Sequence, residues 1–473
     1  MLAACCAAIL FAAAPDTRLV DAVKDQDHAA MTALLKQHAN VNGADPAGET
    51  ALYWAAHWGD AEAVDALVRA GAKPNIASRY GLTALWEAAQ RGDAAVIGKL
   101  LKAGADVQAA NPQGETALLP AARSGNTDAV KLLLDHGSNA NQKENWRGET
   151  ALMLASAEGH TEVVRMLIAH GANANTRSTS FDLEDRDGIV GLQASLYWKG
   201  GLTALLFAAR QGYVETGRAL VEAGADMSMA DTDFHFTPLM EAIFNGHPDF
   251  ARMLVEKGAN LNDGSLYILI DQSAAIPQRG DEQTVAGLTR LWLDRGADPN
   301  LAFNNGKVPP RVTYPAIRYG PIAAGSTPLL SAARMQDAGL MRMLLDKHAD
   351  PNKGTKVDGF TPLMAALSGG GGRRGARAGV SNGMPAIQLL IERGADVNAA
   401  NSRGMTAMHY SARTGNDAAI QFLADHGARL DVKDRLGRTP ADMANGVLTA
   451  VTGADGPRNE RTALLIAKLV GIR

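Results

Sequence analysis

Apolar residues recur along most of the chain in short segments that come in pairs. In the first segment of one pair, Leu52, Ala55 and Ala56 follow an i, i+3, i+4 spacing, and the segment at residues 61–69 repeats it. This spacing places the apolar side chains on one face of an α-helix. The pattern therefore predicts two consecutive short helices, each with one face to bury.

Polar residues and glycines mark where these helices begin and end. Thr50 lies directly before the first apolar segment, where its hydroxyl can cap the helix start, and Gly59 ends that segment. Gly71 follows the second segment, in the place of a glycine with left-handed backbone. His38 and His348 stand where other copies have this closing glycine, and histidine tolerates positive φ better than most residues. The predicted unit is a loop, a short helix, a tight turn, a longer helix and a second loop.

The same unit returns at a nearly constant interval. Close copies read GETALYWAAHWGD at 48–60, GLTALWEAAQRGD at 81–93, GETALLPAARSGN at 114–126 and GETALMLASAEGH at 148–160. Their first glycines are 33, 33 and 34 residues apart. A fixed period of this length is typical of repeat arrays, in which each unit buries its apolar face against its neighbours. We therefore predict an elongated array rather than one large globular core.

The repeated unit resembles the ankyrin repeat. GFTPLMAAL (359–367), HFTPLMEAI (235–243) and GSTPLLSAA (325–333) keep the T-P-L core of that family, and GADVN (394–398) and GADPN (296–300) keep its ending. The resemblance extends over nearly everything after the apolar N-terminal segment. It implies an all-α fold, an ankyrin-repeat solenoid of about twelve helix-turn-helix repeats with β-hairpin-like loops.

Departures from the period define the expected organisation of the chain. We predict a signal peptide at 1–16, an N-terminal capping repeat at 17–44, regular repeats at 45–175, an insertion at 176–197, repeats at 198–300 with the last one degenerate, an insertion at 301–321, repeats at 322–433 with an insertion at 369–384, and a C-terminal capping repeat and helix at 434–473. Insertions in such arrays form loops on one face, often the binding face.

The N-terminal segment carries the only information on location. Residues 2–14 are apolar throughout, too short to cross a bilayer and of the length of a signal-peptide core, although no basic segment precedes them. LAAC at 2–5 is similar to a lipoprotein cleavage site, which we rank second, and a helix capping the first repeat is the third interpretation. We expect a periplasmic or secreted protein, similar to ankyrin-repeat proteins that bacteria export, and a cytoplasmic one if residues 2–14 are not a signal peptide.

Composition argues against several kinds of chemistry. The formal net charge of −4 offers no basic field for nucleic acid. Both cysteines, Cys5 and Cys6, lie in the apolar segment, so the rest of the chain cannot form disulfides or thiolate zinc sites. GGGRRG at 370–375 matches a dinucleotide-binding pattern but follows a predicted helix instead of a strand, and DLEDRD at 182–187 lacks the alternating ligands of a calcium loop. We predict no catalytic residues, no cofactor and no metal.

Contacts between repeats are expected to be mainly apolar. The histidine of the T-P-L-H motif, which in the family ties one repeat to the next, is present only at His409. Tyrosine, tryptophan, leucine or methionine takes its place in the other copies.

The resemblance also implies where a partner would bind. In the family, the concave groove is lined by loop positions beside the first glycine of each repeat and by the last two residues of its first helix. Carried over to this sequence, the predicted loop residues are Tyr80, Trp146, Arg147, Phe234 and Phe236, and the predicted helix-end residues are His57, Trp58, Arg91, Arg123, Arg210, Phe244, Asn245, Arg334 and Arg413. Aromatic residues and arginine dominate the energetic centres of protein interfaces.

The leading hypothesis is a monomeric, non-enzymatic scaffold that binds a partner protein through this groove. Two alternatives stay open: recognition of a peptide or a cell-wall glycan by the aromatic residues, and an enzyme with active residues in the insertions. In a simpler interpretation, the rings pack on neighbouring repeats and the arginines pair with acids such as Glu87 and Glu241.

Overall fold

The computed structural model describes residues 16–180, 200–232, 234–273, 282–303, 325–368, 383–446 and 459–471. The predicted signal segment and most of the three predicted insertions lie outside these residues. The chain divides into two compact units: unit 1 is Met1–Phe181 with Gly200–Met229, and unit 2 is Asp182–Lys199 with Ala230–Arg473.

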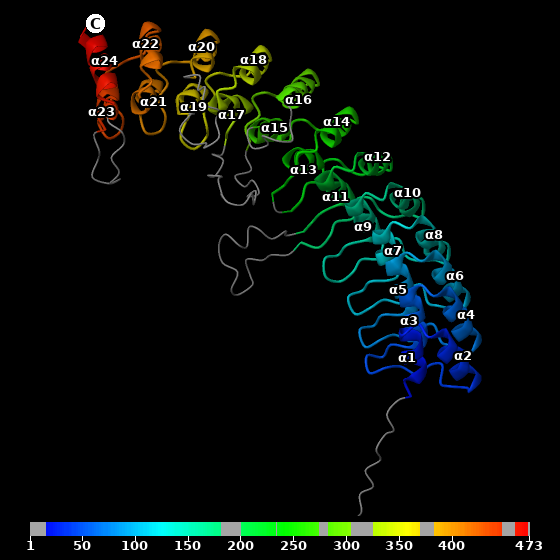
Figure 1. Ribbon diagram of the computed structural model, residues 1–473. Helices are drawn as coiled ribbons and strands as arrows, with labels where there is room; N and C mark the ends of the chain where they lie inside the picture. The colour runs from blue at the N-terminus through cyan, green and yellow to red at the C-terminus, as the bar shows by residue number, and fades with distance from the viewer. Residues whose placement is uncertain are drawn as a thin grey trace, which may run out of the picture. The chain divides into compact units, whose positions relative to one another are not determined.

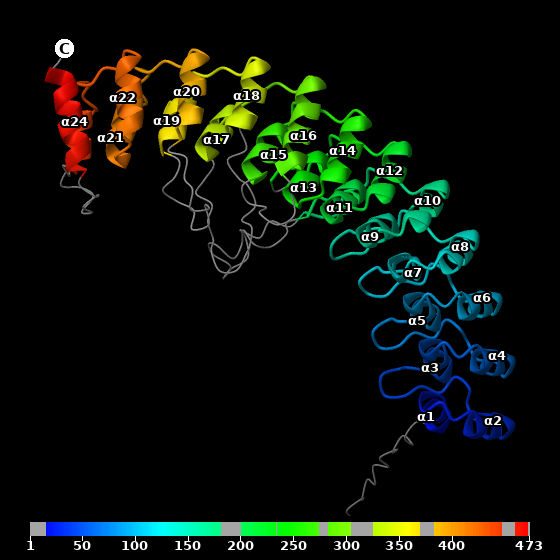
Figure 2. The same cartoon turned by 45° about the horizontal axis from the view of Figure 1, so that its top comes forward.

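Unit 1 consists of paired helices in two rows (Figure 1). Its helices are α1 (Arg18–Lys24), α2 (His28–Lys36), α3 (Ala51–Trp58), α4 (Ala61–Arg69), α5 (Ala84–Arg91), α6 (Ala94–Lys102), α7 (Leu118–Ser124), α8 (Thr127–Asp135), α9 (Ala151–Glu158), α10 (Thr161–Ala169), α11 (Ala204–Gln211) and α12 (Val214–Glu222). Each odd-numbered helix contacts the next odd-numbered helix, and together they form the inner row. The even-numbered helices from α4 to α12 contact one another in the same order and form the outer row (Figure 2).

Unit 2 repeats this arrangement. Its helices are α13 (Pro238–Phe244), α14 (Pro248–Glu256), α15 (Ser265–Ser273), α16 (Glu282–Asp294), α17 (Pro328–Met335), α18 (Ala338–Asp346), α19 (Pro362–Ser368), α20 (Met384–Glu392), α21 (Ala407–Thr414), α22 (Asp417–Asp425), α23 (Pro440–Ala444) and α24 (Glu460–Gly471). The pair α15 and α16 occupies the repeat that the sequence marks as degenerate, and it packs between its neighbours like the others. The prediction of an all-α ankyrin solenoid is confirmed for the described residues.

The predicted start and stop signals act as expected. The hydroxyl of Thr50 accepts the N–H of Tyr53 at 3.1 Å, which caps α3. Gly59 follows α3 with a left-handed φ of 73°, and the closing glycine Gly71 has φ 91°. His38 also adopts positive φ, as its place in the sequence predicts. These local choices set the sharp turns that return each helix pair to the stack.

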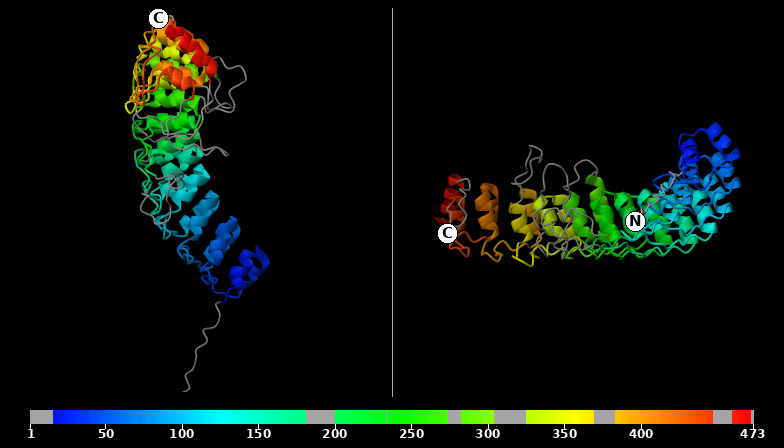
Figure 3. Two further views of the ribbon diagram at one scale, coloured as in Figure 1. Left: turned by 90° about the vertical axis from the view of Figure 1, so that its left-hand side faces the viewer. Right: turned by 90° about the horizontal axis from the view of Figure 1, so that it is seen from below.

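The loops between repeats are short antiparallel hairpins without extended strands in the described residues. Single bridges such as Ala44 with Thr50 and Ala110 with Thr116 close them, which confirms the hairpin-like loops. In each unit, the loops lie along one edge of the helix rows (Figure 3). One backbone bond joins most neighbouring loops, for example Arg79 N–H to Ala47 O at 2.8 Å. Pro112 has no N–H to give at the corresponding place, so this ladder lacks a bond there.

A second ladder runs beside the ends of the outer helices. The side chain of Asn75 donates to Gly104 O at 3.0 Å and accepts the N–H of Asp106 at 2.7 Å, so one amide joins two repeats. Asn141 and Asn352 make the same two bonds in other repeats. The asparagine of the GADxN ending is therefore a connector between repeats.

The core lies between the two rows of each unit. Alanines such as Ala55 and Ala88 are fully buried and let the inner helices approach closely, while leucines such as Leu67 and Leu100 fill the space toward the outer row. Among the described residues, no helix has both the length and the apolar character needed to cross a membrane. The alternation of small and large residues makes one continuous core along each unit.

Candidate interaction surface

The predicted surface of unit 1 combines the C-terminal ends of inner helices with loop tips. Arg91 at the end of α5 and Arg123 near the end of α7 are exposed, as is Arg147 in the loop before α9. Arg210 on α11 is half-buried and has further contacts. Arg123 and Arg210 stand two residues before the glycine that ends their helix, and Arg91 stands one residue before it.

Two aromatic side chains stand out at the loop tips of unit 1. The side chains of Tyr80 and Trp146 are 67% and 63% exposed. Polar groups build the turns beneath them: Ser78 Oγ accepts the N–H of Tyr80 at 3.3 Å, and the buried carboxylate of Glu144 accepts the N–H of Trp146 at 2.6 Å. The guanidinium of Arg147 lies 4.4 Å from the centre of the Trp146 ring. Hydrogen bonds from the backbone to Ser78 and Glu144 thus shape the loops that carry these rings at the surface.

Trp58 is more firmly attached than the sequence predicts. Its side chain is 39% exposed, but its indole N–H donates to the carbonyl of Lys24 at the end of α1, at 3.1 Å. The ammonium of Lys24 in turn lies 4.3 Å from the centre of the Trp54 ring. Trp58 therefore fastens the N-terminal capping helix to α3. The binding role of Trp58 stays a prediction.

A buried carboxylate in the same region, named in the sequence only as a possible partner of arginines, bonds to other side chains instead. Glu87 on α5 accepts the phenol O–H of Tyr53 at 2.6 Å and contacts Nδ1 of His57 at 2.9 Å. Burial, followed by the contact with Glu87, raises the pKa of Tyr53. His57 is thus half-buried and bonded across repeats. Glu87 stands where most other copies have an aromatic or apolar residue, such as Trp54 or Leu154, and this contrast is the signal that could have revealed its role.

Two of the predicted surface residues belong to the core. Phe236 is 0% and Phe244 8% exposed, and their rings pack edge to face with centroids 5.5 Å apart. The prediction that they face a groove is wrong, because both rings fill the space between α13 and the loop before it. Phe234 is half-buried beside Phe236, and Asn245 donates to the carbonyl of Glu241 at 2.9 Å.

The remaining predicted residues lie in unit 2. Arg334 on α17 and Arg413 on α21 are exposed, each near the end of an inner helix. The binding role of this set stays a prediction. Arg373, Arg374 and Arg377 of the predicted insertion at 369–384 lie outside the described residues.

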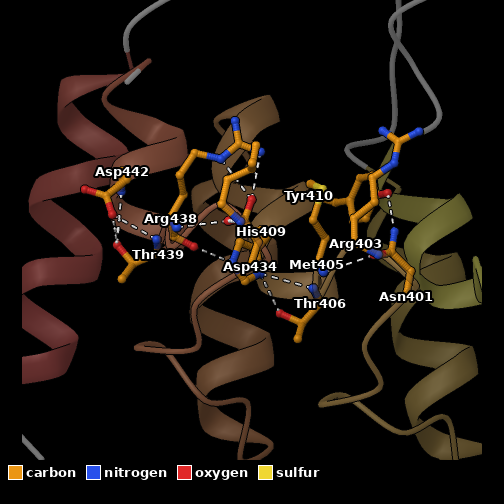
Figure 4. Close-up of polar contacts among 11 residues, drawn as sticks. Asn401, Arg403, Met405, Thr406, His409, Tyr410, Asp434, Arg438, Thr439 and Asp442 are labelled. Atoms are coloured by element: carbon orange, nitrogen blue, oxygen red, sulfur yellow. Dashed lines mark hydrogen bonds and ion pairs between the residues drawn. The ribbon is translucent and has the colours of Figure 1, made fainter. Parts of the chain in front are cut away.

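His409 confirms its predicted role as a tie between repeats. Its Nδ1 accepts the N–H of Thr406 at 3.1 Å, and Nε2 lies 3.1 Å from the carbonyl of Arg438 in the next repeat (Figure 4). These partners require a neutral ring with the proton on Nε2. Burial lowers the pKa of His409, which keeps that form at neutral pH. Beyond it, Arg438 pairs with Asp434 at 2.7 Å, and Thr439 with Asp442 forms a capping box at the start of α23.

Charged groups elsewhere in the described residues do not gather into a metal site. No group of three or more histidine, cysteine or acidic side chains in the part of the chain that the structure describes could hold a metal ion. Each unit is a stack of helix-turn-helix repeats with exposed arginines, and unit 1 also exposes aromatic rings. This is the architecture of a repeat scaffold.

Comparison with known families identifies the type of repeat. Ankyrin-repeat models of three copies match residues 19–111, 85–178, 189–265 and 376–452, and the single-repeat model matches 324–356. Together the matches cover more than half of the chain, so this protein belongs to the ankyrin-repeat family.

Individual relatives match only parts of the chain. Human ankyrin repeat and SOCS box protein 16 is 28% identical over 246 residues, 49% of this chain and 51% of that protein. Mouse ankyrin repeat and SOCS box protein 6 is 32% identical over 111 residues, 24% of this chain and 26% of the relative. The E3 ubiquitin-protein ligase KEG of Arabidopsis thaliana is 25% identical over 269 residues, 52% of this chain and 16% of the relative. The chain spans about half or less of the length of these relatives.

Because these relatives are animal and plant proteins, the resemblance to exported bacterial ankyrin-repeat proteins stays a prediction.

Proposed function

We propose that this protein is a non-enzymatic scaffold that binds a partner protein through the loop tips and inner-helix ends of unit 1. The observation that carries the proposal is the exposure of Tyr80 and Trp146. Large aromatic side chains displayed at the surface favour an interface, since water-exposed apolar area is costly unless a partner covers it. Ankyrin relatives with SOCS-box or ligase names fit a family in which the repeats join a protein to others.

The exposed arginines favour a protein over a glycan as the partner. Rings alone could stack on sugars, whereas Arg91, Arg123 and Arg147 supply planar donors for carboxylates and carbonyls. Aromatic residues and arginine together are the usual anchors of protein interfaces.

Alanine variants of the two displayed rings test the proposal. Tyr80→Ala and Trp146→Ala should leave the thermal melt within about 1 kcal/mol of wild type, because little of either ring is buried. Each should weaken capture of the partner from a host-cell extract about tenfold, a loss of about 1.4 kcal/mol. Capture is quantified by mass spectrometry against the wild-type protein.

The matched control is Leu436→Ala in unit 2, which removes an apolar loop-tip side chain of similar exposure, 60%. This variant should capture the unit 1 partner normally. Equal capture by wild type and both ring variants would show that unit 1 is not the site. Binding to a glycan array with no protein captured would favour carbohydrate recognition instead.

We also propose that the protein is exported, on the strength of the apolar segment at residues 2–14. Mass spectrometry of the mature protein from its host should then find a new N-terminus between about residues 12 and 17. Cytosolic protein with the N-terminus intact would reject export.

A further inference from the structure

A second group of side chains, in unit 2, has the chemistry of an anion site. Phe360, before α19, and Tyr410, on α21, pack with ring centroids 5.4 Å apart at an interplanar angle of 73°. Arg413 places its guanidinium carbon 5.1 Å from the centre of the Tyr410 ring. Asn401 and Arg403 come from the loop before α21 and are grouped beside Tyr410 in Figure 4. The sequence pattern identified only Arg413 of this group.

The hydroxyl of Tyr410 is oriented by Asn401. The amide oxygen of Asn401 accepts the N–H groups of Arg403 at 2.9 Å and of Met405 at 3.0 Å, which directs its NH₂ group toward Tyr410. That NH₂ group donates to the Tyr410 hydroxyl at 3.0 Å. The hydroxyl oxygen is thus occupied as an acceptor, and its own proton has no acceptor among the described residues. Tyr410 is buried, so an unused donor there is costly.

The two arginines add to this surplus of donors. Within the described parts of unit 2, neither Arg403 nor Arg413 forms an ion pair with a carboxylate, whereas Arg438 pairs with Asp434 and Arg393 with Asp346. Both Arg403 and Arg413 are exposed. Burial raises the pKa of Tyr410, and the carboxylate of Asp358 acts in the same direction, while the positive charges of Arg413 and Arg403 act in the opposite direction. The hydroxyl therefore stays protonated at neutral pH and remains a donor.

We propose that Arg403, Arg413 and the Tyr410 hydroxyl bind a carboxylate side chain of an acidic peptide segment in a partner protein. A carboxylate is the acceptor that two guanidinium groups and one hydroxyl complement best, since each charged hydrogen bond is stronger than a neutral one. The edges of the Phe360 and Tyr410 rings give the aliphatic part of a glutamate or aspartate an apolar surface. The inference rests on the proposed scaffold function and adds a second contact, with a defined partner chemistry, in unit 2.

Binding of a synthetic acidic peptide to the full-length protein tests the site. The probe is a fluorescein-labelled peptide of about ten residues that alternates glycine and glutamate, followed by fluorescence anisotropy. The same peptide with glutamine in place of glutamate should not bind. Raising the ionic strength from about 0.05 M to about 0.5 M should weaken binding of the acidic peptide, because salt screens exposed charges.

Variants locate the binding to this group. Binding of the acidic peptide should be about tenfold weaker in each of three variants, Arg403→Gln, Arg413→Gln and Tyr410→Phe. Arg429→Gln is the matched control: this exposed arginine belongs to the same repeat but follows α22, and its removal changes the net charge equally. Circular dichroism verifies that each variant is folded.

Two results would overturn the assignment. The first is an Arg429→Gln variant that loses as much affinity as Arg403→Gln and Arg413→Gln, since binding would then follow net charge. The second is binding of a phosphoserine peptide without binding of the glutamate peptide, which would assign the group to phosphate. Either result leaves the unit 1 proposal intact, because Tyr80 and Trp146 are tested with a different ligand.

Discussion

At the scale of single residues, the repeat depends on a few positions where backbone conformation decides which residue fits. Gly104 closes α6 with φ 84°, and a Cβ atom added there would meet nothing within 4 Å. Any cost of a side chain at this position is therefore the cost of the left-handed backbone alone. Gly98 lies inside the same helix with ordinary backbone, where a Cβ would make one normal contact with Leu132 at 3.7 Å.

Gly104→Val should lower the free energy of unfolding by about 1 kcal/mol or more, because a β-branched residue fits positive φ poorly. Gly98→Ala in the same helix should raise it by about 0.5–1 kcal/mol, since alanine is the better helix former. Urea melts of both variants give the comparison. A Gly104→Val protein as stable as wild type would contradict the turn described here.

The neutral form of His409 predicts a pH dependence. Burial lowers its pKa below the ordinary value of 6.5, so the unfolded chain takes up the proton at a higher pH than the folded chain. The stability that neutral His409 contributes is therefore complete above about pH 6.5 and is lost as the pH falls below that value. The lowered pKa values of Asp434 and Asp442 matter only in the more acidic range near and below 3.8.

His409→Leu should remove this dependence, because leucine already fills the same position in copies such as Leu119 and Leu330. At pH 7 the variant should be less stable by roughly 1 kcal/mol from the lost hydrogen bonds. At about pH 5.5 the difference should shrink, since the wild type alone loses stability on acidification. The stability difference between wild type and variant is measured at each pH by hydrogen exchange of α21 to α24. A difference that stays constant with pH would rule out His409 as the titrating group.

At the scale of elements, the asparagine ladder joins the ends of neighbouring outer helices, and Gln108 is a position that departs from it. Gln108 stands where most other repeats have asparagine, and its side chain keeps the bond to Gly137 O at 2.6 Å. Ser228 and Asp431 occupy the same position in two further repeats. The amide oxygen of Gln108 accepts no backbone N–H of the next repeat among the described residues, whereas the amide oxygen of Asn75 accepts the N–H of Asp106. The extra methylene of glutamine moves the amide beyond the position where one group can serve both partners.

Gln108→Asn should restore the second bond and raise the free energy of unfolding by about 0.5–1.5 kcal/mol. The reciprocal change Asn75→Gln is the control and should lower it by a similar amount. Both are read from denaturant midpoints of the full chain. Destabilisation by Gln108→Asn would mean that the loop has adapted to the longer side chain.

The sequence predicts the elements better than the surface they carry. Thr50, Gly59 and Gly71 act through bonds and backbone angles within a few residues, so their roles follow from local pattern. Whether Phe244 faces solvent depends on Phe236 and on the space beneath α13, which pattern alone does not contain. Tyr410 is a comparable case, because its relation to Arg403 arises only when the loop and the helix are placed together.

At the scale of the whole molecule, the stability of a repeat array is nearly a sum of terms between neighbours. In each unit, an inner helix contacts its own outer helix and the inner helices beside it. A disturbance in the core should accordingly spread to adjacent repeats and weaken with distance along the chain.

Leu100 in α6 and Leu390 in α20 are both fully buried, one in each unit. Leu100→Ala should cost about 2–5 kcal/mol through lost contacts and the cavity left behind. Hydrogen exchange should then accelerate in α3 to α8, while α18 to α22 keep wild-type protection, because no shared core couples distant repeats. Leu390→Ala is the reciprocal variant and should accelerate exchange in α18 to α22 and leave α3 to α8 unchanged. If either substitution raised exchange equally in both regions, the chain would unfold as one cooperative body and the nearest-neighbour description of its stability would be wrong.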